Sequence, residues 1–327
     1  MSKLRIGLIG YGRWGTHYGR LLSQQDDQRK ALHFVGAVDL KPERREAFRN
    51  KHPGTAIYEH MDHLLTEGRP EAVIIATPAS THSALVARCL TENLHVLCEK
   101  PLGMSKKMCV TLHEQAKRAQ KVLMVDYTFL HHAHFQYLRE QVHDETLGQI
   151  YHMQMLRTHA EPVRNDVNVI TDLASHDIAM CHSLFNMPPE WVSAQAQQIL
   201  PHPHVDIADL HLGYLHGARA HIHVSWLSPF KTRQMKITGS KQSALWNELN
   251  PETPVILKPQ GQPDTQETPA LKCPEPLKSV LDTFLESIEN GTAVTDGLFA
   301  AQVARVLAAV EASLRQGGAK ICLNDLC

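Results

Sequence analysis

The first 125 residues alternate short apolar runs with helical patterns. Apolar runs without regular polar interruptions are typical of strands that are buried on both faces of a parallel sheet. They occur at residues 4–9, 34–38, 56–58, 72–76, 95–98 and 122–125. Because helical patterns separate most of these runs, residues 1–125 are predicted to form a doubly wound α/β domain.

Residues 126–327 show a different pattern. Apolar and polar residues alternate strictly in several segments, which predicts strands with one packed and one exposed face, as in an antiparallel sheet. Strand patterns occur at residues 151–155, 192–197, 210–215, 220–226, 235–237 and 243–249. Residues 260–276 read as a loop, and two helices are expected at about 278–290 and 297–315. This part is therefore predicted to be an α+β domain with a large, mostly antiparallel open sheet.

A glycine-rich turn joins the first strand to the first helix. The segment from Gly10 through Gly12 to Gly15 has the spacing GxGxxG. The first glycine permits a tight turn, the second lets the backbone approach a pyrophosphate, and the third allows close packing of helix and strand. The phosphates would lie at the positive end of the helix. This predicts a Rossmann-type dinucleotide site, with Arg13 and Trp14 among its contacts.

Asp39 ends the second strand at a distance from the glycines that suits the adenosine ribose. Its carboxylate would accept hydrogen bonds from the ribose and repel a 2′-phosphate, so NAD is favoured over NADP. Arg44 and Arg45 follow closely and weaken that preference, which leaves NADP open. The two arginines could equally be solvated charges on a helix.

The fifth strand ends in Glu99-Lys100-Pro101. Proline stops a strand, and the residue before it is held extended. Lys100 would therefore stand at the carboxyl edge of the sheet, where open α/β sheets bind ligands. The plain alternative is a surface lysine beside a loop proline.

The glycine turn, the Ala76-Thr77-Pro78 segment with His82, and Glu99-Lys100-Pro101 together resemble the Gfo/Idh/MocA oxidoreductase family. It is named for glucose–fructose oxidoreductase, inositol dehydrogenase and a rhizopine-catabolism protein. The resemblance implies that Lys100 is catalytic or orients the substrate. Thr77, Pro78, His82 and Glu99 are then candidate cofactor contacts, although His82 could simply be a residue of the first helical turn.

Asp172 and His176 are four residues apart in a predicted helix, so they share one face. An aspartate one turn away can orient an imidazole or raise its basicity, which suits a general base, although such pairs are usually ordinary helix decoration. The resemblance implies more, because Asp-x-x-x-His-Asp matches the family's catalytic pattern. It implies that His176 is the base, Asp172 assists it, and Lys100 completes the group. Upstream of Asp172 the chain lacks the glycines that many family members carry there. This segment resembles that of a subgroup found among sugar and sugar-nucleotide dehydrogenases.

These residues predict an NAD-dependent dehydrogenase or reductase acting on a secondary alcohol or ketone of a sugar, cyclitol or sugar nucleotide. Candidate substrate contacts are Tyr127, Arg157, His159 and Arg164. Two alternatives stay open: a catalytically silent regulator that binds the dinucleotide, and an imine- or biliverdin-type reductase on the same scaffold. Retention of Lys100, Asp172 and His176 argues against the regulator, which needs none of them.

The composition narrows the classes of partner that the protein is expected to bind. The formal net charge is −1, so no global basic field would attract nucleic acid or anionic lipid. No apolar run approaching a membrane span and no secretory segment is recognised. The seven cysteines are scattered without a CxxC, which fits a reducing cytoplasm. The exposed sheet face suggests a homodimer or homotetramer.

Histidine is abundant, with 22 residues in the chain. Three groups were considered as metal ligands: residues 131, 132 and 134, the pair 202 and 204, and the pair 221 and 223. Two histidines at i and i+2 on a strand point to one face. No carboxylate or thiol completes a set at recognisable spacing, so no metal is expected.

Overall fold

The structure is a computed structural model that describes residues 3–27, 32–160, 167–262 and 264–325. Its contacts divide the chain into two compact units. The first unit contains Met1–Asp126 and Leu277–Ala301, and the second contains Tyr127–Pro276 and Gln302–Cys327.

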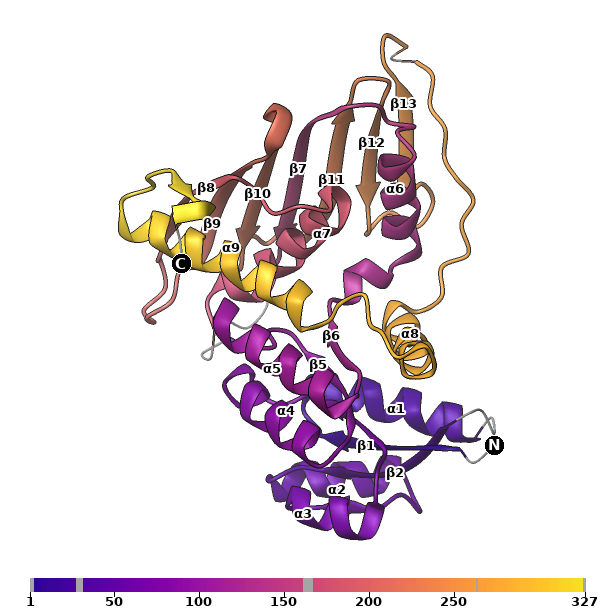
Figure 1. The fold of residues 1–327 in the computed structure, drawn as a ribbon. Coiled ribbons are helices and arrows are strands. Elements are labelled where there is room, and N and C mark those ends of the chain that lie inside the picture. Colours follow the sequence, from indigo (N-terminus) through magenta and orange to yellow (C-terminus); the bar gives the residue numbers. More distant parts are fainter. Residues whose placement is uncertain (1–2, 28–31, 161–166, 263, 326–327) are drawn as a thin grey trace. The chain divides into compact units, whose positions relative to one another are not determined.

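The first unit is built on a parallel sheet with the strand order β3-β2-β1-β4-β5-β6 (Figure 1). Its described strands are β1 (Leu4–Ile9), β2 (Leu32–Val38), β3 (Ile57–Tyr58), β4 (Ala72–Ile75), β5 (His95–Glu99) and β6 (Leu123–Asp126). The winding direction changes next to β1, which pairs with β2 on one side and β4 on the other. Because the strands are parallel, the turns after β1, β2, β4 and β5 share the carboxyl edge where ligands bind in such sheets. This confirms the predicted doubly wound domain.

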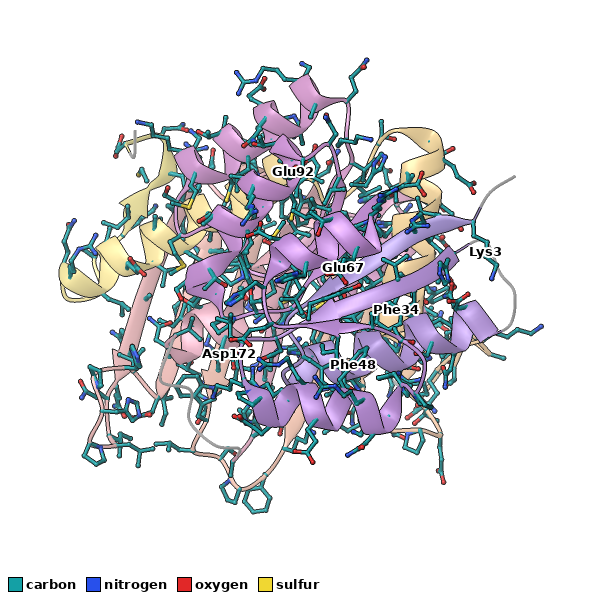
Figure 2. The ribbon with its side chains drawn as sticks, turned by 90° about the horizontal axis from the view of Figure 1, so that it is seen from below. Lys3, Phe34, Phe48, Glu67, Glu92 and Asp172 are labelled. Carbon is teal, nitrogen blue, oxygen red and sulfur yellow. The ribbon has the colours of Figure 1, made fainter. Side chains whose placement is uncertain are left out.

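Helices follow the strands of the first unit. They are α1 (Arg13–Asp27), α2 (Pro42–Lys51), α3 (Met61–His63) with the π-helix η1 (Leu64–Gly68), η2 (Ala79–Thr81), α4 (His82–Thr91), α5 (Lys106–Ala119) and α8 (Pro276–Asn290). Apolar side chains join these helices to the sheet: the rings of Phe34 on β2 and Phe48 on α2 meet edge to face at 5.9 Å (Figure 2). Ser105 caps α5 by accepting the backbone N–H of Met108.

Helix α8 lies far along the chain but packs in the core of the first unit. Leu277, Val280, Leu281 and Phe284 are buried in the same apolar cluster as Leu22. Their spacing places them on one face of the helix, which is the face a sheet can cover. All residues after 125 were predicted to form the second domain, whereas Leu277–Ala301 belongs to the first compact unit.

The second unit is built on a larger sheet with the strand order β13-β12-β11-β7-β10-β9-β8-β14. Its described strands are β7 (Ile150–Thr158), β8 (Trp191–Gln197), β9 (Ile207–Gly213), β10 (Arg219–Ser225), β11 (Thr232–Gly239), β12 (Gln242–Asn247), β13 (Val255–Pro259) and β14 (Ile321–Cys322). The neighbouring strands pair antiparallel, apart from β7 and β10, which run parallel. The predicted mostly antiparallel sheet is confirmed, and β13 and β14 are additions to the predicted strands.

One face of this sheet is buried and the other is polar. On β7, Met153 and Met155 are buried, whereas His152 is exposed and Gln154 half-buried. The remaining elements of the unit are η3 (Thr128–His131), α6 (Ala133–His143), η4 (Ile170–Ala174), α7 (Ser175–Phe185), η5 (Leu215–Gly217), α9 (Gly297–Arg315) and η6 (Leu323–Asp325). Helix α9 begins within the first unit and continues in the second.

Among the described helices, α9 is long and apolar enough by length and composition to cross a membrane, with a mean hydropathy of 1.4 over an 18-residue window. No segment of this kind was predicted from the sequence. Of that window, 56% is buried inside the fold, and Val303, Val306 and Val310 lie in the core. Core helices of globular proteins meet the same test, so α9 supports no conclusion about a membrane.

Candidate active site

The turn between β1 and α1 requires glycine at two of its three positions. Gly10 has a φ of 96°, and a Cβ there would lie 2.6 Å from the carbonyl oxygen of Ala76. A Cβ at Gly15 would lie 2.0 Å from the carbonyl oxygen of Gly10, so only glycine lets α1 pack this closely on the strand end. At Gly12 the nearest atoms belong to the Arg44 side chain, from 3.5 Å outward. The turn therefore fits the close approach of a pyrophosphate to the N-terminus of α1.

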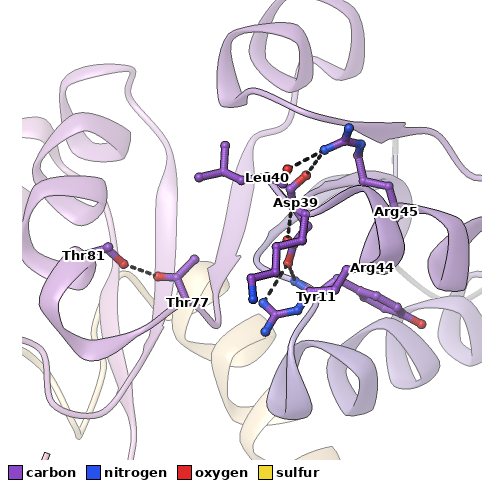
Figure 3. Close-up of polar contacts among 8 residues, drawn as sticks. Tyr11, Asp39, Leu40, Arg44, Arg45, Thr77 and Thr81 are labelled. Atoms are coloured by element: carbon purple, nitrogen blue, oxygen red, sulfur yellow. Dashed lines mark hydrogen bonds and ion pairs between the residues drawn. The ribbon is translucent and has the colours of Figure 1, made fainter. Parts of the chain in front are cut away.

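Four further residues predicted to contact the cofactor lie beside this edge of the sheet. Arg13 and Trp14 form the exposed first turn of α1. Thr77 and Pro78 follow β4 directly, and the hydroxyl of Thr77 is 2.7 Å from that of Thr81 (Figure 3). Their contact with a bound dinucleotide stays a prediction.

Asp39 is held in one orientation by the backbone around it. Its Oδ2 accepts the N–H of Tyr11 at 2.8 Å, and its Oδ1 accepts the N–H of Lys41 at 2.9 Å (Figure 3). The residue is only 6% exposed, so these bonds form in a protected position at the end of β2. The turn after β1 and the end of β2 are thereby joined, which fixes the acceptor expected to meet the ribose.

The two arginines on α2 take different roles. Arg45 donates to the carbonyl oxygens of Asp39 and Leu40 at 2.9 and 2.8 Å and pairs with Glu59 at 3.1 Å. Arg44 places Nη1 3.4 Å from Asp39 Oδ2 and lies beside Gly12 (Figure 3). Arg45 therefore supports the turn, whereas Arg44 is the cation placed next to the predicted ribose site.

His82 connects two loops of the first unit. The ring is buried, with Nδ1 2.8 Å from the carbonyl oxygen of Pro101 and Nε2 2.8 Å from that of Thr77. Both nitrogens thus contact carbonyl oxygens, and only a doubly protonated ring can donate to both. His82 was predicted to contact the cofactor. Its ring links the turn after β4 to the loop that follows Lys100, and its contact with the cofactor stays a prediction.

Glu99 lies in the core beneath Lys100. It is buried at the end of β5, in register with Asp126 on β6, and Asp126 accepts the hydroxyl of Tyr18 at 2.6 Å. Burial, together with the neighbouring Asp126 carboxyl, raises the pKa of Glu99 well above its usual range. A buried carboxyl in this position suits a supporting role, and its predicted contact with the cofactor stays a prediction. Lys100 is half-buried, and its peptide bond to Pro101 is cis.

In the second unit, a π-helical turn and the start of α7 carry the predicted catalytic pair. Asn168 starts it by accepting the N–H of Thr171 on its side chain at 2.8 Å and that of Asp172 on its carbonyl at 2.9 Å. Asp172 lies in η4, and His176 lies in the first turn of α7. Such π-helical turns occur frequently at functional sites. The pairing of Asp172 with His176 stays a prediction.

Arg157 was predicted to contact the substrate, but its guanidinium is committed to Asp177. Nη2 is 2.9 Å from Oδ1, and Nε is 3.3 and 3.2 Å from the two carboxylate oxygens. The side chains are 7% and 2% exposed. These bonds engage Nε and Nη2, which form one edge of the planar guanidinium, and a contact of Arg157 with the substrate stays a prediction. Burial raises the pKa of the Asp177 carboxyl, and the charge of Arg157 opposes that shift.

Phe129 links this ion pair to His176. The Arg157 guanidinium carbon lies 4.0 Å above the centre of the Phe129 ring, and the His176 ring meets Phe129 edge to face at 4.8 Å. Neither Phe129 nor Asp177 was assigned a role from the sequence. Asp177 stood in the quoted Asp-x-x-x-His-Asp pattern, whereas nothing in the local sequence pointed to Phe129.

Three substrate contacts predicted from the sequence remain, namely Tyr127, His159 and Arg164. Tyr127 is 3% exposed and His159 is 9% exposed, and the backbone N–H of His159 donates to Ser225 at 3.1 Å. Arg164 lies outside the described residues. Lys100 belongs to the first unit, whereas Asp172 and His176 belong to the second. Their action as one catalytic group stays a prediction.

Two family models match the chain in succession. Residues 4–127 match the model of the oxidoreductase family with an NAD-binding Rossmann fold, and residues 135–245 match the GFO/IDH/MocA C-terminal domain. Together these matches cover well over half of the chain.

Curated relatives and solved structures agree with the two family models. The chain is 25% identical to myo-inositol 2-dehydrogenase of Thermotoga maritima, over 79% of each chain. It is 23% identical to inositol 2-dehydrogenase of Rhizobium meliloti, over 96% of this chain and 98% of that one. Its fold matches UDP-N-acetylglucosamine 3-dehydrogenase GnnA from Acidithiobacillus ferrooxidans with a TM-score of 0.85, at 23% identity and over 97% and 99% of the chains. The chain belongs to the Gfo/Idh/MocA family of NAD-binding oxidoreductases.

Proposed function

We propose that this protein catalyses reversible hydride transfer between NAD and a secondary alcohol of a cyclitol, a sugar or a sugar nucleotide. The observation that carries this proposal is the combination of family membership with Lys100, Asp172 and His176 at the family's motif positions. Relatives named for inositol and the structural neighbour named for a UDP-sugar support this range of substrates.

Each residue has a chemical role in the proposal. His176 takes the hydroxyl proton as general base, and Asp172 orients the imidazole or raises its basicity. Lys100 donates a hydrogen bond to the same oxygen and stabilises the negative charge that develops there. Bound NAD would accept the hydride from the carbinol carbon. In the opposite direction the same residues reduce a ketone, with His176 returning the proton.

The surroundings of His176 support its role as base. Phe129 packs against one edge of the imidazole, and Arg157 packs on Phe129 while bound to Asp177. Because Phe129 restricts the imidazole in the folded protein, the ring loses fewer orientations when it accepts a proton. This favours proton transfer at a defined atom. Phe129, Arg157 and Asp177 are therefore positioning residues in this proposal.

The test is a scan of cyclitols, aldoses and nucleotide sugars for NADH formation, with Lys100→Ala and His176→Ala beside the wild-type protein. Lys106→Ala changes an exposed lysine of α5 and is the matched control. Turnover lost in both variants but kept in the control, with NAD binding retained by calorimetry, supports the proposal. NAD binding without turnover on any polyol favours a regulatory protein, and activity that survives His176→Asn favours an imine- or biliverdin-type reductase.

We also propose a homodimer or homotetramer that forms through the polar face of the second sheet. His152, His221 and Asp209 occupy this face, and half-buried Leu156 lies in register with His223 at its centre. Light scattering after gel filtration should show an oligomer, and Leu156→Arg should reduce it to a monomer. A cytoplasmic location is proposed as well, since the described cysteines are all free thiols.

A further inference from the structure

Two histidines and a cysteine come together in the second unit. His132 and His134 stand at the start of α6, and Cys273 lies in the loop that precedes α8. One potential ligand atom from each residue lies within 4.8 Å of the other two. No metal was expected from the sequence, because no carboxylate or thiol completes a ligand set at recognisable spacing. The thiol that joins this pair is 139 residues from His134.

The distances suit a shared ion. Cys273 Sγ is 3.5 Å from His134 Nδ1 and 3.4 Å from Nε2, so a rotation of the ring would turn either nitrogen toward a common point. Ligands of a tetrahedral zinc ion, at about 2.0 Å for nitrogen and 2.3 Å for sulfur, lie roughly 3.5 Å apart. The rings of His132 and His134 are stacked with their centres 5.0 Å apart. Small side-chain movements therefore bring the three ligand atoms to coordination distance.

The protein already holds the two histidines in place. His132 caps α6, with Nδ1 accepting the N–H of His134 at 3.3 Å. Its ring lies 5.0 Å from that of Trp246, which is 3% exposed on β12. The cap contact is long for a hydrogen bond, so its exchange for a metal bond costs little. Cys273 is exposed, which gives an ion access from solvent.

The ligand types select the class of ion. Imidazole and thiolate suit zinc and similar borderline or soft ions, whereas magnesium and calcium prefer oxygen ligands. Three protein ligands leave a fourth position for water. Binding would release the Cys273 thiol proton to the buffer and a coordinated water from the ion for each protein ligand that replaces it.

We propose that His132, His134 and Cys273 bind one zinc ion, which fastens the loop at residues 260–276 to the start of α6. The described residues of this segment lie outside any helix as far as Glu275, and they form one isolated bridge, between Leu257 and Glu267. A metal bond at Cys273 would therefore supply the loop with an attachment near its end. The proposal does not depend on the proposed dehydrogenase activity.

The experiment is a titration of the untagged full-length protein with cobalt(II), which replaces zinc and reports its ligands by absorption. A thiolate-to-cobalt charge-transfer band that saturates at one equivalent, and that zinc abolishes, is expected for the wild-type protein. Cys273→Ser should lose the band and bind zinc at least tenfold more weakly in competition with a chelator. Cys322→Ser removes the other described exposed thiol and should behave as wild type.

A second measurement follows the loop itself. Zinc should slow proteolytic cleavage within residues 260–276 in the wild-type protein and in Cys322→Ser, and have no such effect in Cys273→Ser. Both variants change exposed side chains, so the fold should survive them. The proposal is overturned if the band is absent, or if Cys273→Ser binds zinc as tightly as wild type, since surface histidines alone would then account for binding.

Discussion

Replacement of Arg157 by methionine should destabilise the second unit strongly. Methionine keeps much of the side-chain volume but leaves the Asp177 carboxylate, with a side chain only 2% exposed, without its charged partner. Removing one member of a buried ion pair costs about 3–5 kcal/mol. For a domain of 150–250 residues, this corresponds to a fall in melting temperature of roughly 6–20 °C. The free energy of unfolding would be measured by guanidinium chloride titration, followed by circular dichroism.

Two further variants sharpen this prediction. Arg233 also lies near Phe129, 5.7 Å from its centre, but its side chain is 30% exposed and its partner Glu248 is 19% exposed. Arg233→Met should therefore cost only about 0–1 kcal/mol. The double variant Arg157→Met, Asp177→Leu should recover most of the stability, because a buried pair can often be replaced by apolar residues at little cost.

Enzyme kinetics separates this structural role from the substrate contact expected from the sequence. With the cation gone from the face of Phe129, the His176 ring loses part of its support, so kcat should fall more than KM rises. An Arg157→Met protein with unchanged unfolding free energy and a raised KM alone would refute the reasoning and return Arg157 to the substrate.

Three other predictions follow from the first unit and from η3. Gly15→Ala should destabilise the protein by about 1–3 kcal/mol and abolish NAD binding, because the added Cβ would lie 2.0 Å from a backbone oxygen. Gly12→Ala should keep the melting temperature and only weaken NAD binding, which calorimetry can measure. Arg44→Ala should raise the ratio of kcat/KM for NAD over NADP, and Asp39→Ala should lower it, each by about tenfold for one charge-assisted bond; no change in either variant would remove both residues from cofactor selection. Burial lowers the pKa of His131 to about 4 from 6.5, so the unfolded chain takes up a proton there before the native protein does, and stability is lost as the pH falls from 6.5 to 4. His131→Gln should lessen that loss, by at most about 3 kcal/mol, in unfolding titrations across this range, and an unaltered pH profile would count against it.

The sequence predicts elements well where a pattern is long or a steric requirement is local. The strand at residues 4–9 and the helix at 297–315 have the bounds that the pattern indicated. Gly15 is required by a contact within its own turn, which a short motif records. Strand β14, whose Ile321 pairs with Val192 of β8, was not predicted. Its two residues are too few to show a period.

Residues whose role depends on a distant partner were harder to assign. His82 reads as a ligand contact or as a helix residue, and the carbonyl oxygens that occupy its ring are 5 and 19 residues away. Glu99 carries no local sign that Asp126 lies beside it on the next strand. Cys273 offers the extreme case, since its histidine partner is 139 residues distant. Pairings of this kind depend on the tertiary fold and leave no spacing to recognise.

Arg157 is different, because the strand pattern itself indicates its buried position. It continues the series Met153, Met155, Arg157 at a spacing of two residues, and this series marks the packed face of β7. A strand sends alternate side chains to opposite faces, so the predicted strand, extended by two residues, already places this arginine inside. A buried guanidinium requires an anion, and the Asp177 carboxylate, beside the expected base His176, supplies it. The alternation that identifies the core of a sheet thus also identifies charged residues that need a partner within that core. Such residues should first be considered as part of the scaffold of a site and only then as contacts to its substrate.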